Sequence, residues 1–332
     1  MVERQPSKLY MRVRFPSLAP MKSLKVAIIG GGVVGQYISW KLSSLGHSVS
    51  IFDYRKEEHL KDKSCSVLVS ERIKDFIPLN ENHIENTIES CTINFPKRRV
   101  LLNFFPKHLA LNKERLMETF LNLNKKSGTS FFFEKSIKEL PKDFDIIIGC
   151  DGANSIVRKS LGLKSPKMKI GVQWFNEEED FSHVTQTFPH SQGFSWRIPR
   201  GKKVECGSFG DPSKKGELGA LIPSPGFPLL NAGLIFSNKE NIALCGDSMG
   251  LTKPWSGGGI IWNLYAADIL IKNFPNFNKY KKEVIKYFWW KILKGKILNH
   301  LVYFLGYNFP YLLPREINYD NDSSVAFKIK KW

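Results

Sequence analysis

A glycine-rich stretch at residues 30–35 constrains the fold of this chain more than any other part of its sequence. It follows the apolar run 25–29, whose continuous hydrophobicity is typical of a strand buried on both faces. A helical pattern comes next and stops at Gly46, and a second apolar run, 49–52, ends at Asp53. Strand, glycine turn, helix and strand in this order, with an acidic residue at the end, predict a unit that binds a dinucleotide.

The glycines of this stretch have the spacing GxGxxG, and each has a physical role. Gly30 permits a tight turn, Gly32 lets the backbone approach a pyrophosphate, and Gly35 lets helix and strand pack closely. The helix N-terminus, which includes Val34, offers free N–H groups and the positive end of a dipole to phosphates. Asp53 follows at the distance where a carboxylate accepts from ribose hydroxyls and disfavours a 2′-phosphate, so FAD or NAD fits better than NADP.

Two later stretches, 145–158 and 245–260, place an Asp-Gly pair and a Gly-Asp pair after apolar strand patterns. The second continues into a run of three glycines and a helical pattern. Together with the first unit, and over most of residues 22–275, they resemble the FAD-dependent oxidoreductases of the glutathione-reductase superfamily, in the branch of para-hydroxybenzoate hydroxylase. The resemblance implies FAD as the cofactor.

The resemblance also implies a place for each motif. Asp151 and Gly152 would lie beside the cofactor pyrophosphate, and Asp247 would hydrogen-bond the ribitol chain of FAD. A third group would bring backbone close to the pyrimidine ring of the flavin: Pro254, Gly257, Gly258, Gly259 and Ile260. A glycine-rich helix start suits this place because its N–H dipoles stabilise the negative charge of a reduced flavin and no side chain intervenes.

Two finer features resemble the geranylgeranyl reductase family. The stretch from Pro254 to Ile260 resembles its PxxGGGI motif. The second feature resembles its YxWxFPxG motif, which lines a lipid cavity and would make the following residues substrate-binding: Phe194, Trp196, Ile198 and Pro199. Phe194 and Trp196 also alternate as they would in the core of a sheet, so the pattern alone leaves that interpretation open.

The same family carries a cysteine loop near the flavin, which Ser64, Cys65 and Val67 would form here. Cys65 is therefore the candidate catalytic or redox residue, with an inert small side chain as the alternative. The family also supplies an arginine to the cofactor from the segment 108–128, and Lys113 takes that position. Lysine cannot make the bidentate contact of arginine, which weakens this part of the predicted site.

The predicted reaction is saturation of prenyl double bonds, in which a hydride from reduced FAD reaches one alkene carbon and a proton reaches the other. An isolated alkene has no carbonyl to polarise, so the protein must supply proximity, orientation and a dry cavity. The electron donor is unidentified: ferredoxin, NAD(P)H and a reduced deazaflavin all remain open. Three alternatives stand beside this prediction: a halogenase, whose WxWxIP signature is also similar, an aromatic monooxygenase, and a flavin-binding, membrane-associated protein without catalysis.

The fold class predicted is α/β, or α+β overall, in five parts. A discontinuous Rossmann-type FAD-binding domain takes residues 22–165 and 238–275. Gly- and Pro-interrupted strand patterns predict an inserted antiparallel substrate domain over 166–237, with part of 76–106. Residues 1–20 are expected to form a flexible arm, and 276–332 a helical, basic and aromatic region.

The cysteines and histidines indicate no metal. The five cysteines lie far apart without CxxC spacing, and no HExxH pair occurs, which argues against disulfides and a zinc site and favours a reducing cytoplasm. No stretch reaches the roughly 18 apolar residues of a membrane span, and 298–314 comes closest.

A net charge of +18, from 49 Lys+Arg against 31 Asp+Glu, requires an explanation. No nucleic-acid module is recognisable, so no nucleic acid is expected as a partner. The lysines concentrate over 279–296, interleaved with Tyr and Trp, a pattern that predicts contact with an anionic membrane surface at its inner face. The alternatives are a packed helix with a solvated lysine face, and a prenylated lipid or prenyl diphosphate as the anionic substrate.

Overall fold

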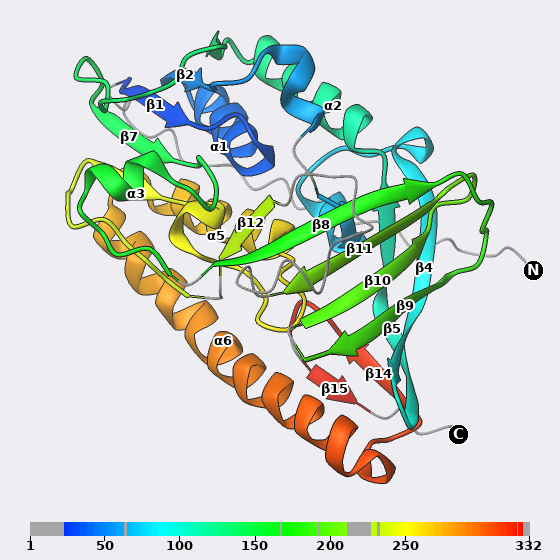
Figure 1. Cartoon of the computed structure of the whole chain (residues 1–332). Helices are drawn as coiled ribbons and strands as arrows, with labels where there is room; N and C mark the ends of the chain where they lie inside the picture. Colours follow the sequence, from blue (N-terminus) through cyan, green and yellow to red (C-terminus); the bar gives the residue numbers. More distant parts are fainter. Residues whose placement is uncertain are drawn as a thin grey trace, which may run out of the picture.

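The structure, a computed structural model, combines two sheets with helices packed around them (Figure 1). It describes residues 23–62, 65–166, 168–191, 193–210, 227–230, 233–323 and 325–327. The predicted arm 1–20 therefore lies outside the described residues, as do Ser64 and parts of the predicted substrate domain, namely 167, 192, 211–226 and 231–232.

The first sheet is parallel, with strand order β13-β7-β1-β2-β6. Its strands are β1 (Lys25–Ile29), β2 (Ser48–Phe52), β6 (Ser130–Phe132), β7 (Ile146–Gly149) and β13 (Ile242–Leu244). Helices α1 (Val33–Ser44), α2 (Lys113–Lys126) and α5 (Ile260–Asn273) pack beside it, while α3 (Ile156–Ser160) follows β7. Continuous apolar strands such as β1, of which four residues are buried, form the core of this layer. The predicted β-α-β unit is β1-α1-β2, and the apolar run that begins at residue 242 returns to the same sheet as β13, so both predictions are confirmed.

The second sheet has ten strands in the order β12-β8-β11-β10-β9-β4-β5-β14-β15, with β3 on β5, and it bends strongly in Figure 1. Three parts of the chain supply it. The first gives β3 (Leu68–Ser70), β4 (Ile84–Phe95) and β5 (Arg98–Leu111). The second gives β8 (Met168–Asn176), β9 (Val184–His190), β10 (Gly193–Pro199), β11 (Val204–Gly210) and β12 (Phe227–Leu230). The third gives β14 (Glu316–Asp320) and β15 (Val325–Phe327).

The antiparallel strands predicted over 166–237 with part of 76–106 are thus present, but β4 and β9 pair in parallel, and the sheet reaches further along the chain. Segment 68–70 joins it, and so do residues 316–320 and 325–327. Within 276–332 the predicted helix is α6 (Phe277–Asn308), whereas residues 316–320 form a strand that pairs in parallel with β5. Pro310 and Pro314 separate the two, because proline cannot continue a helical hydrogen-bond ladder.

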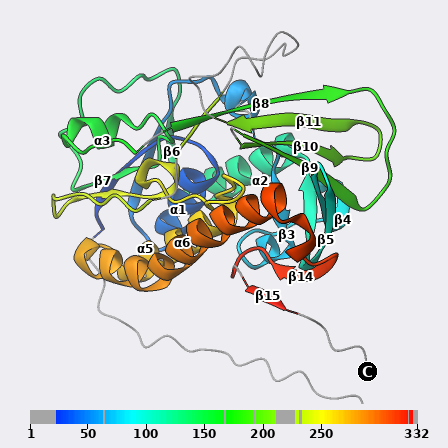
Figure 2. The ribbon, with the colours of Figure 1, turned by 60° about the horizontal axis from the view of Figure 1, so that its bottom comes forward.

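Helix α6 connects the two layers. Its first half packs with Phe277, Tyr280, Val284, Phe288 and Ile292, which recur every three or four residues and so share one face. Its second half lies directly on the second sheet. Gly306 contacts Phe95 of β4 so closely that a Cβ at Gly306 would lie 2.3 Å from the ring. Figure 2 shows the helix running from α5 toward β14 across the molecule. Among the helices that the structure describes, none is long and apolar enough to cross a membrane.

Candidate active site

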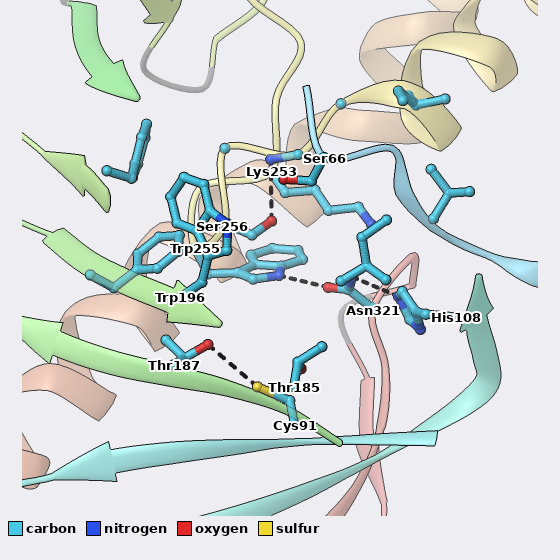
Figure 3. Close-up of a pocket in the computed structure, with 18 of the residues that line it drawn as sticks. Ser66, Cys91, His108, Thr185, Thr187, Trp196, Lys253, Trp255, Ser256 and Asn321 are labelled. Atoms are coloured by element: carbon cyan, nitrogen blue, oxygen red, sulfur yellow. Dashed lines mark hydrogen bonds between the residues drawn. The ribbon is translucent and has the colours of Figure 1, made fainter. Parts of the chain in front are cut away.

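One continuous cavity of about 670 Å³ extends from the glycine turn after β1, past the start of α5, to the space between the second sheet and α6. Residues of all three predicted cofactor motifs and of the predicted substrate motif line it. The fold therefore brings together segments that lie more than 200 residues apart in the sequence, and Figure 3 shows part of the cavity wall.

The glycines of the first motif have different surroundings. Gly30 has φ +105°, and a Cβ there would lie 2.4 Å from the carbonyl oxygen of Cys150. A Cβ at Gly35 would lie 2.0 Å from the carbonyl oxygen of Gly30, so both positions exclude a side chain. Gly32 lines the cavity instead, with no atom within 4 Å of a Cβ position. It is the N-cap of α1 without a side-chain cap, so open space lies before the free N–H groups near Val34, as phosphate binding requires.

Asp53 is 4% exposed and does not line the cavity. Arg55 lines the cavity at this end instead. Asp53 Oδ2 accepts from the backbone N–H of Gly31 at 2.7 Å and from Nη2 of Arg55 at 2.8 Å, while Oδ1 accepts from Nε of Arg55 at 2.9 Å. Burial alone would raise the pKa of Asp53, but the hydrogen bonds and charge of Arg55 outweigh it and lower the pKa. A ribose at this end would therefore meet Arg55, with Asp53 held behind it. The only sequence signal for the role of Arg55 was its position two residues after Asp53.

In the second motif Gly152 lines the cavity and Asp151 lies behind it. Asp151 Oδ2 accepts from the backbone N–H of Ile156 at 2.6 Å, at the start of α3. Its Oδ1 is buried and has no hydrogen-bond partner within the described structure. The side chain thus fixes the loop after β7, while Gly152 presents backbone to the cavity.

The third motif forms the opposite wall. Asp247, Gly257, Gly258, Gly259 and Ile260 all line the cavity, as predicted for a flavin site. Pro254 does not line it and lies against α6, where a Cβ at Gly295 would be 3.3 Å from its ring.

Two polar side chains lie in the same place. Asp247 Oδ1 accepts from Nδ2 of Asn263 at 3.1 Å, and Oδ1 of Asn263 is buried with no hydrogen-bond partner in the described structure. Gly259, the N-cap of α5, has no side-chain cap, so the helix begins with free N–H groups facing this part of the cavity. A polyol chain and the polar edge of a planar ring fit such an arrangement.

The cysteine loop also reaches the cavity. Cys65, Ser66 and Val67 line it, as does Lys113, the first residue of α2, while Ser64 lies outside the described residues. Val67 has φ +43°, a left-handed conformation that is strained for a β-branched residue and is a feature of functional sites. Cys65 remains a predicted catalytic residue whose position fits, and no interaction in the structure assigns it a reaction step.

The other half of the cavity is apolar. Phe194, Trp196 and Ile198 line it, while Pro199 does not. Strands β4 and β5 and helix α6 contribute further walls: Ile93, Phe95, Val100, Leu102, Leu298, Val302 and Leu305. The described lining residues with a basic or acidic side chain, namely Arg55, His108, Lys113, Asp247 and Lys253, lie outside the apolar half. The polar residues beside it are uncharged: Thr185, Gln186, Thr187, Asn299 and Tyr303. The space between the second sheet and α6 therefore suits an uncharged, hydrophobic group.

Comparison with known proteins agrees with this geometry. No protein-family model matches the chain. Digeranylgeranylglycerophospholipid reductase 1 of Methanosphaera stadtmanae is 23% identical over 328 residues, which cover 81% of this chain and 80% of the relative. Kynurenine 3-monooxygenase of Anopheles gambiae is 27% identical over 209 residues, 53% of this chain. The matched part is only 42% of that monooxygenase, so the chain spans about two fifths of its length.

Solved structures give the fold. A geranylgeranyl bacteriochlorophyll reductase-like protein of Thermoplasma acidophilum superposes with a TM-score of 0.71 at 16% identity, over 84% of this chain and 87% of its own. A tryptophan 6-halogenase of Streptomyces toxytricini gives 0.63 at 15% identity, over 78% and 75%. The chain has the fold of the flavin-dependent reductases, monooxygenases and halogenases. The resemblance and fold class predicted from the motifs are confirmed, and FAD, the predicted cofactor, is the cofactor of this group.

Within this flavoprotein fold, a buried ion-pair network that no motif predicted holds the substrate wall against the cysteine loop. Arg200 pairs with Glu205 at 2.6 Å and with Glu85 at 2.6 Å, and the side chains of Arg200 and Glu205 are 4% and 0% exposed. Glu205 also accepts from the hydroxyl of Ser66 and, at 3.0 Å, from the indole N–H of Trp196. The network thereby fixes the ring of Trp196 and the strained loop together.

The indole ring of Trp196 also needs space across the sheet. It faces Gly207, its partner on β11, where a Cβ would lie 2.1 Å from the ring. The hydrogen bond to Glu205 therefore fixes the ring, and the absence of a side chain at Gly207 leaves the space that the ring occupies. Charged residues inside a strand pattern, at 200 and 205, were the sequence signal for this network.

A second network brings Asn321, labelled in Figure 3, and Asp322 to the site. Asn321 accepts from the indole N–H of Trp255 at 2.8 Å and donates to Nε2 of His108 at 3.1 Å. Asp322 pairs with Lys253 at 2.8 Å in a buried contact. Burial and the charge of Lys253 lower the pKa of His108 to about 3, so His108 is neutral near pH 7. No local sequence pattern marked Asn321 or Asp322, because their role depends on the return of β14 to the second sheet.

Proposed function

We propose that this chain is an FAD-dependent reductase that saturates carbon–carbon double bonds of geranylgeranyl-type prenyl chains. One observation carries the proposal: a cavity lined by dinucleotide motifs continues into an apolar chamber whose described walls bring no charged side chain. A long hydrocarbon chain is the substrate class that such a chamber accommodates without leaving a polar group unpaired. The matches to a digeranylgeranylglycerophospholipid reductase and to a geranylgeranyl reductase-like structure support it.

FAD fits the residues present. The N–H groups at the start of α1, beside Gly32, would hold its phosphates, and Asp247 its polyol chain. The glycines before α5 would lie along the ring, where free N–H groups stabilise negative charge. When bound and reduced, this cofactor would supply the hydride for an alkene.

The residues of the chamber supply the rest of what the reaction needs. Trp196, fixed by Glu205, and Phe194 would orient an apolar chain and exclude water from it. An unactivated alkene offers no oxygen to hydrogen-bond, so its reduction depends on orientation more than on a strong acid or base. The neutral state of His108 agrees with a site of this kind.

A monooxygenase acting on an aromatic substrate is the second candidate, favoured by the kynurenine 3-monooxygenase matches. An amino-acid substrate carries a carboxylate and an ammonium group, which need partners of opposite charge when they leave water. The apolar chamber offers no such charged partner among its described lining residues. The prenyl substrate is therefore the better fit.

The two candidates differ in their need for oxygen. The purified protein should show the visible absorption of oxidised flavin, or acquire it when reconstituted with FAD. After anaerobic reduction by dithionite, a geranylgeranyl lipid should reoxidise the flavin and yield a saturated product by mass spectrometry. Reoxidation that requires oxygen and an aromatic substrate would replace the reductase by the monooxygenase, and a protein unable to bind FAD would refute both.

Replacing Trp196 by alanine should lower turnover of long prenyl chains by about tenfold or more while FAD stays bound, because a large apolar contact on the substrate is lost. The measurement is kcat/KM with a geranylgeranyl substrate, beside the flavin-to-protein ratio. Phe188→Ala is the matched control, since Phe188 lies on the neighbouring strand, is 42% exposed and does not line the cavity. Unchanged turnover in Trp196→Ala would remove Trp196 from the substrate site.

A further inference from the structure

The second half of α6 is apolar both toward the cavity and toward the solvent. Toward the protein, Leu298, Val302 and Leu305 line the cavity. Toward the solvent runs a second apolar series with helical spacing of three and four residues, of which Leu301 also reaches the cavity: Trp290, Leu293, Ile297, Leu301 and Phe304. In this outer series Trp290 is 70% exposed and Ile297 62%. A helix in water normally presents polar residues at such positions.

The apolar surface continues beyond the helix. The ring of Phe304 lies 5.8 Å from that of Phe309, which lies 6.4 Å from that of Tyr311. We call the combined surface the outer apolar face; its residues are Trp290, Leu293, Ile297, Leu301, Phe304, Phe309, Tyr311 and Leu312. Contiguous exposed aromatic and aliphatic side chains of this kind mark a surface that has an apolar partner.

The charge around this face is strongly positive. Residues 277–308 contain seven lysines and one glutamate, which leaves a net charge of +6. Lys286, Lys294 and Lys296 are exposed beside the outer apolar face. In a symmetric dimer built on this face, these lysines would approach their own copies and repel them. An apolar layer bordered by negative charge, which is the surface of an anionic bilayer, complements the face instead.

The cavity reaches the same surface. Leu301 and Leu312 line the cavity, and they are also 47% and 59% exposed. They therefore stand at its mouth, between the apolar chamber and the outer apolar face. Any apolar layer that covered this face would be in direct contact with the opening.

We propose that the outer apolar face docks on an anionic membrane and that the cavity takes its apolar chain directly from the bilayer through the mouth at Leu301 and Leu312. The docking stands independently of the reaction. The second part rests on the proposed prenyl reductase function. Together they explain why one helix is apolar on both sides: its inner side lines the chamber and its outer side enters the lipid.

Flotation with lipid vesicles tests the docking. The full chain should float with phosphatidylglycerol vesicles at low salt, and bind phosphatidylcholine vesicles and high-salt samples much less, because salt screens the lysines. The double variant Trp290→Glu/Ile297→Glu should lose at least tenfold in binding to phosphatidylglycerol. The matched control is Leu45→Glu/Phe181→Glu, which replaces two equally exposed apolar residues outside α6 and should bind like the wild type.

Absence of wild-type flotation at low salt, or equal flotation of the α6 double variant, would overturn the docking proposal. Size-exclusion chromatography tests the alternative that a second copy of the chain covers the face. A wild-type dimer that becomes a monomer in the α6 double variant would support this alternative over the membrane. Neither Trp290 nor Ile297 lines the cavity, so the double variant tests the surface and not the chamber.

Turnover of one prenyl lipid in two presentations tests the uptake. The α6 double variant should lose about tenfold in turnover of the lipid embedded in vesicles and keep its turnover of the same lipid dispersed in detergent. Equal losses in both presentations would overturn uptake from the bilayer. If the wild type floats but reduces the lipid in neither presentation, the docking stands and the proposed function fails.

Discussion

Gly32→Val should lower the affinity for FAD at least about 100-fold, the equivalent of about 3 kcal/mol, and leave the protein folded. A side chain at Gly32 would meet no protein atom, since nothing lies within 4 Å of its Cβ position and its φ of −75° suits any residue. The valine would instead fill the open space before the N-terminus of α1. That space is where the phosphates have to approach the backbone.

The flavin-to-protein ratio after reconstitution and the thermal melting of the apoprotein, measured side by side, check this result. Gly35→Ala is the contrasting variant. Its Cβ would lie 2.0 Å from the carbonyl oxygen of Gly30, so it should lower the melting temperature as well as FAD binding. Normal FAD retention in Gly32→Val would place the phosphates elsewhere and contradict the site.

Glu205→Ala should lower the free energy of unfolding by about 3–5 kcal/mol, because it leaves the buried guanidinium of Arg200 with a single carboxylate partner. The same change removes the acceptor of the Trp196 indole and of the Ser66 hydroxyl. We therefore expect lower prenyl turnover even where the variant remains folded.

Urea unfolding measures the loss. Glu178→Ala is the matched control, since Glu178 pairs with Arg197 at 2.7 Å but its side chain is 57% exposed, and its loss should cost at most about 1 kcal/mol. The double variant Glu205→Leu/Arg200→Leu should recover part of the stability, because no unpaired buried charge remains. A loss in Glu205→Ala no larger than in Glu178→Ala would show that the network does not stabilise the fold.

Local patterns allowed the nucleotide-binding layer to be predicted from the sequence. Strands β1, β7 and β13 are short apolar runs, and the turn at Gly30–Gly35 has a fixed spacing, so neighbours along the chain carry the information. The strand β14 gave no comparable signal. Its five residues alternate weakly, and it exists because it pairs with Leu101–Phe104, more than 200 residues earlier. Pairing at that separation leaves no periodicity to detect.

The residues of the site likewise divide into those that local motifs predicted and those that they did not. Gly32, Asp247, Gly257–Gly259 and Trp196 belong to motifs, and the structure places all of them around one cavity. Arg55 escaped prediction because the motif specifies only the carboxylate at Asp53, although Arg55 occupies the wall. Asn321 and Asp322 escaped because their roles depend on contacts with residues that only the folded chain brings near.

The contact between Asp322 and Lys253 has a consequence for the order of folding. Lys253 is buried next to the third cofactor motif, and burial lowers its pKa while Asp322 opposes that change. During synthesis earlier residues emerge first, so every strand of the nucleotide-binding layer, of which β13 is the last, is available before β14. The partner of Lys253 arrives only after residue 322 has left the ribosome. The cofactor pocket can therefore be completed only late in synthesis, with uptake of the flavin following translation of the second sheet.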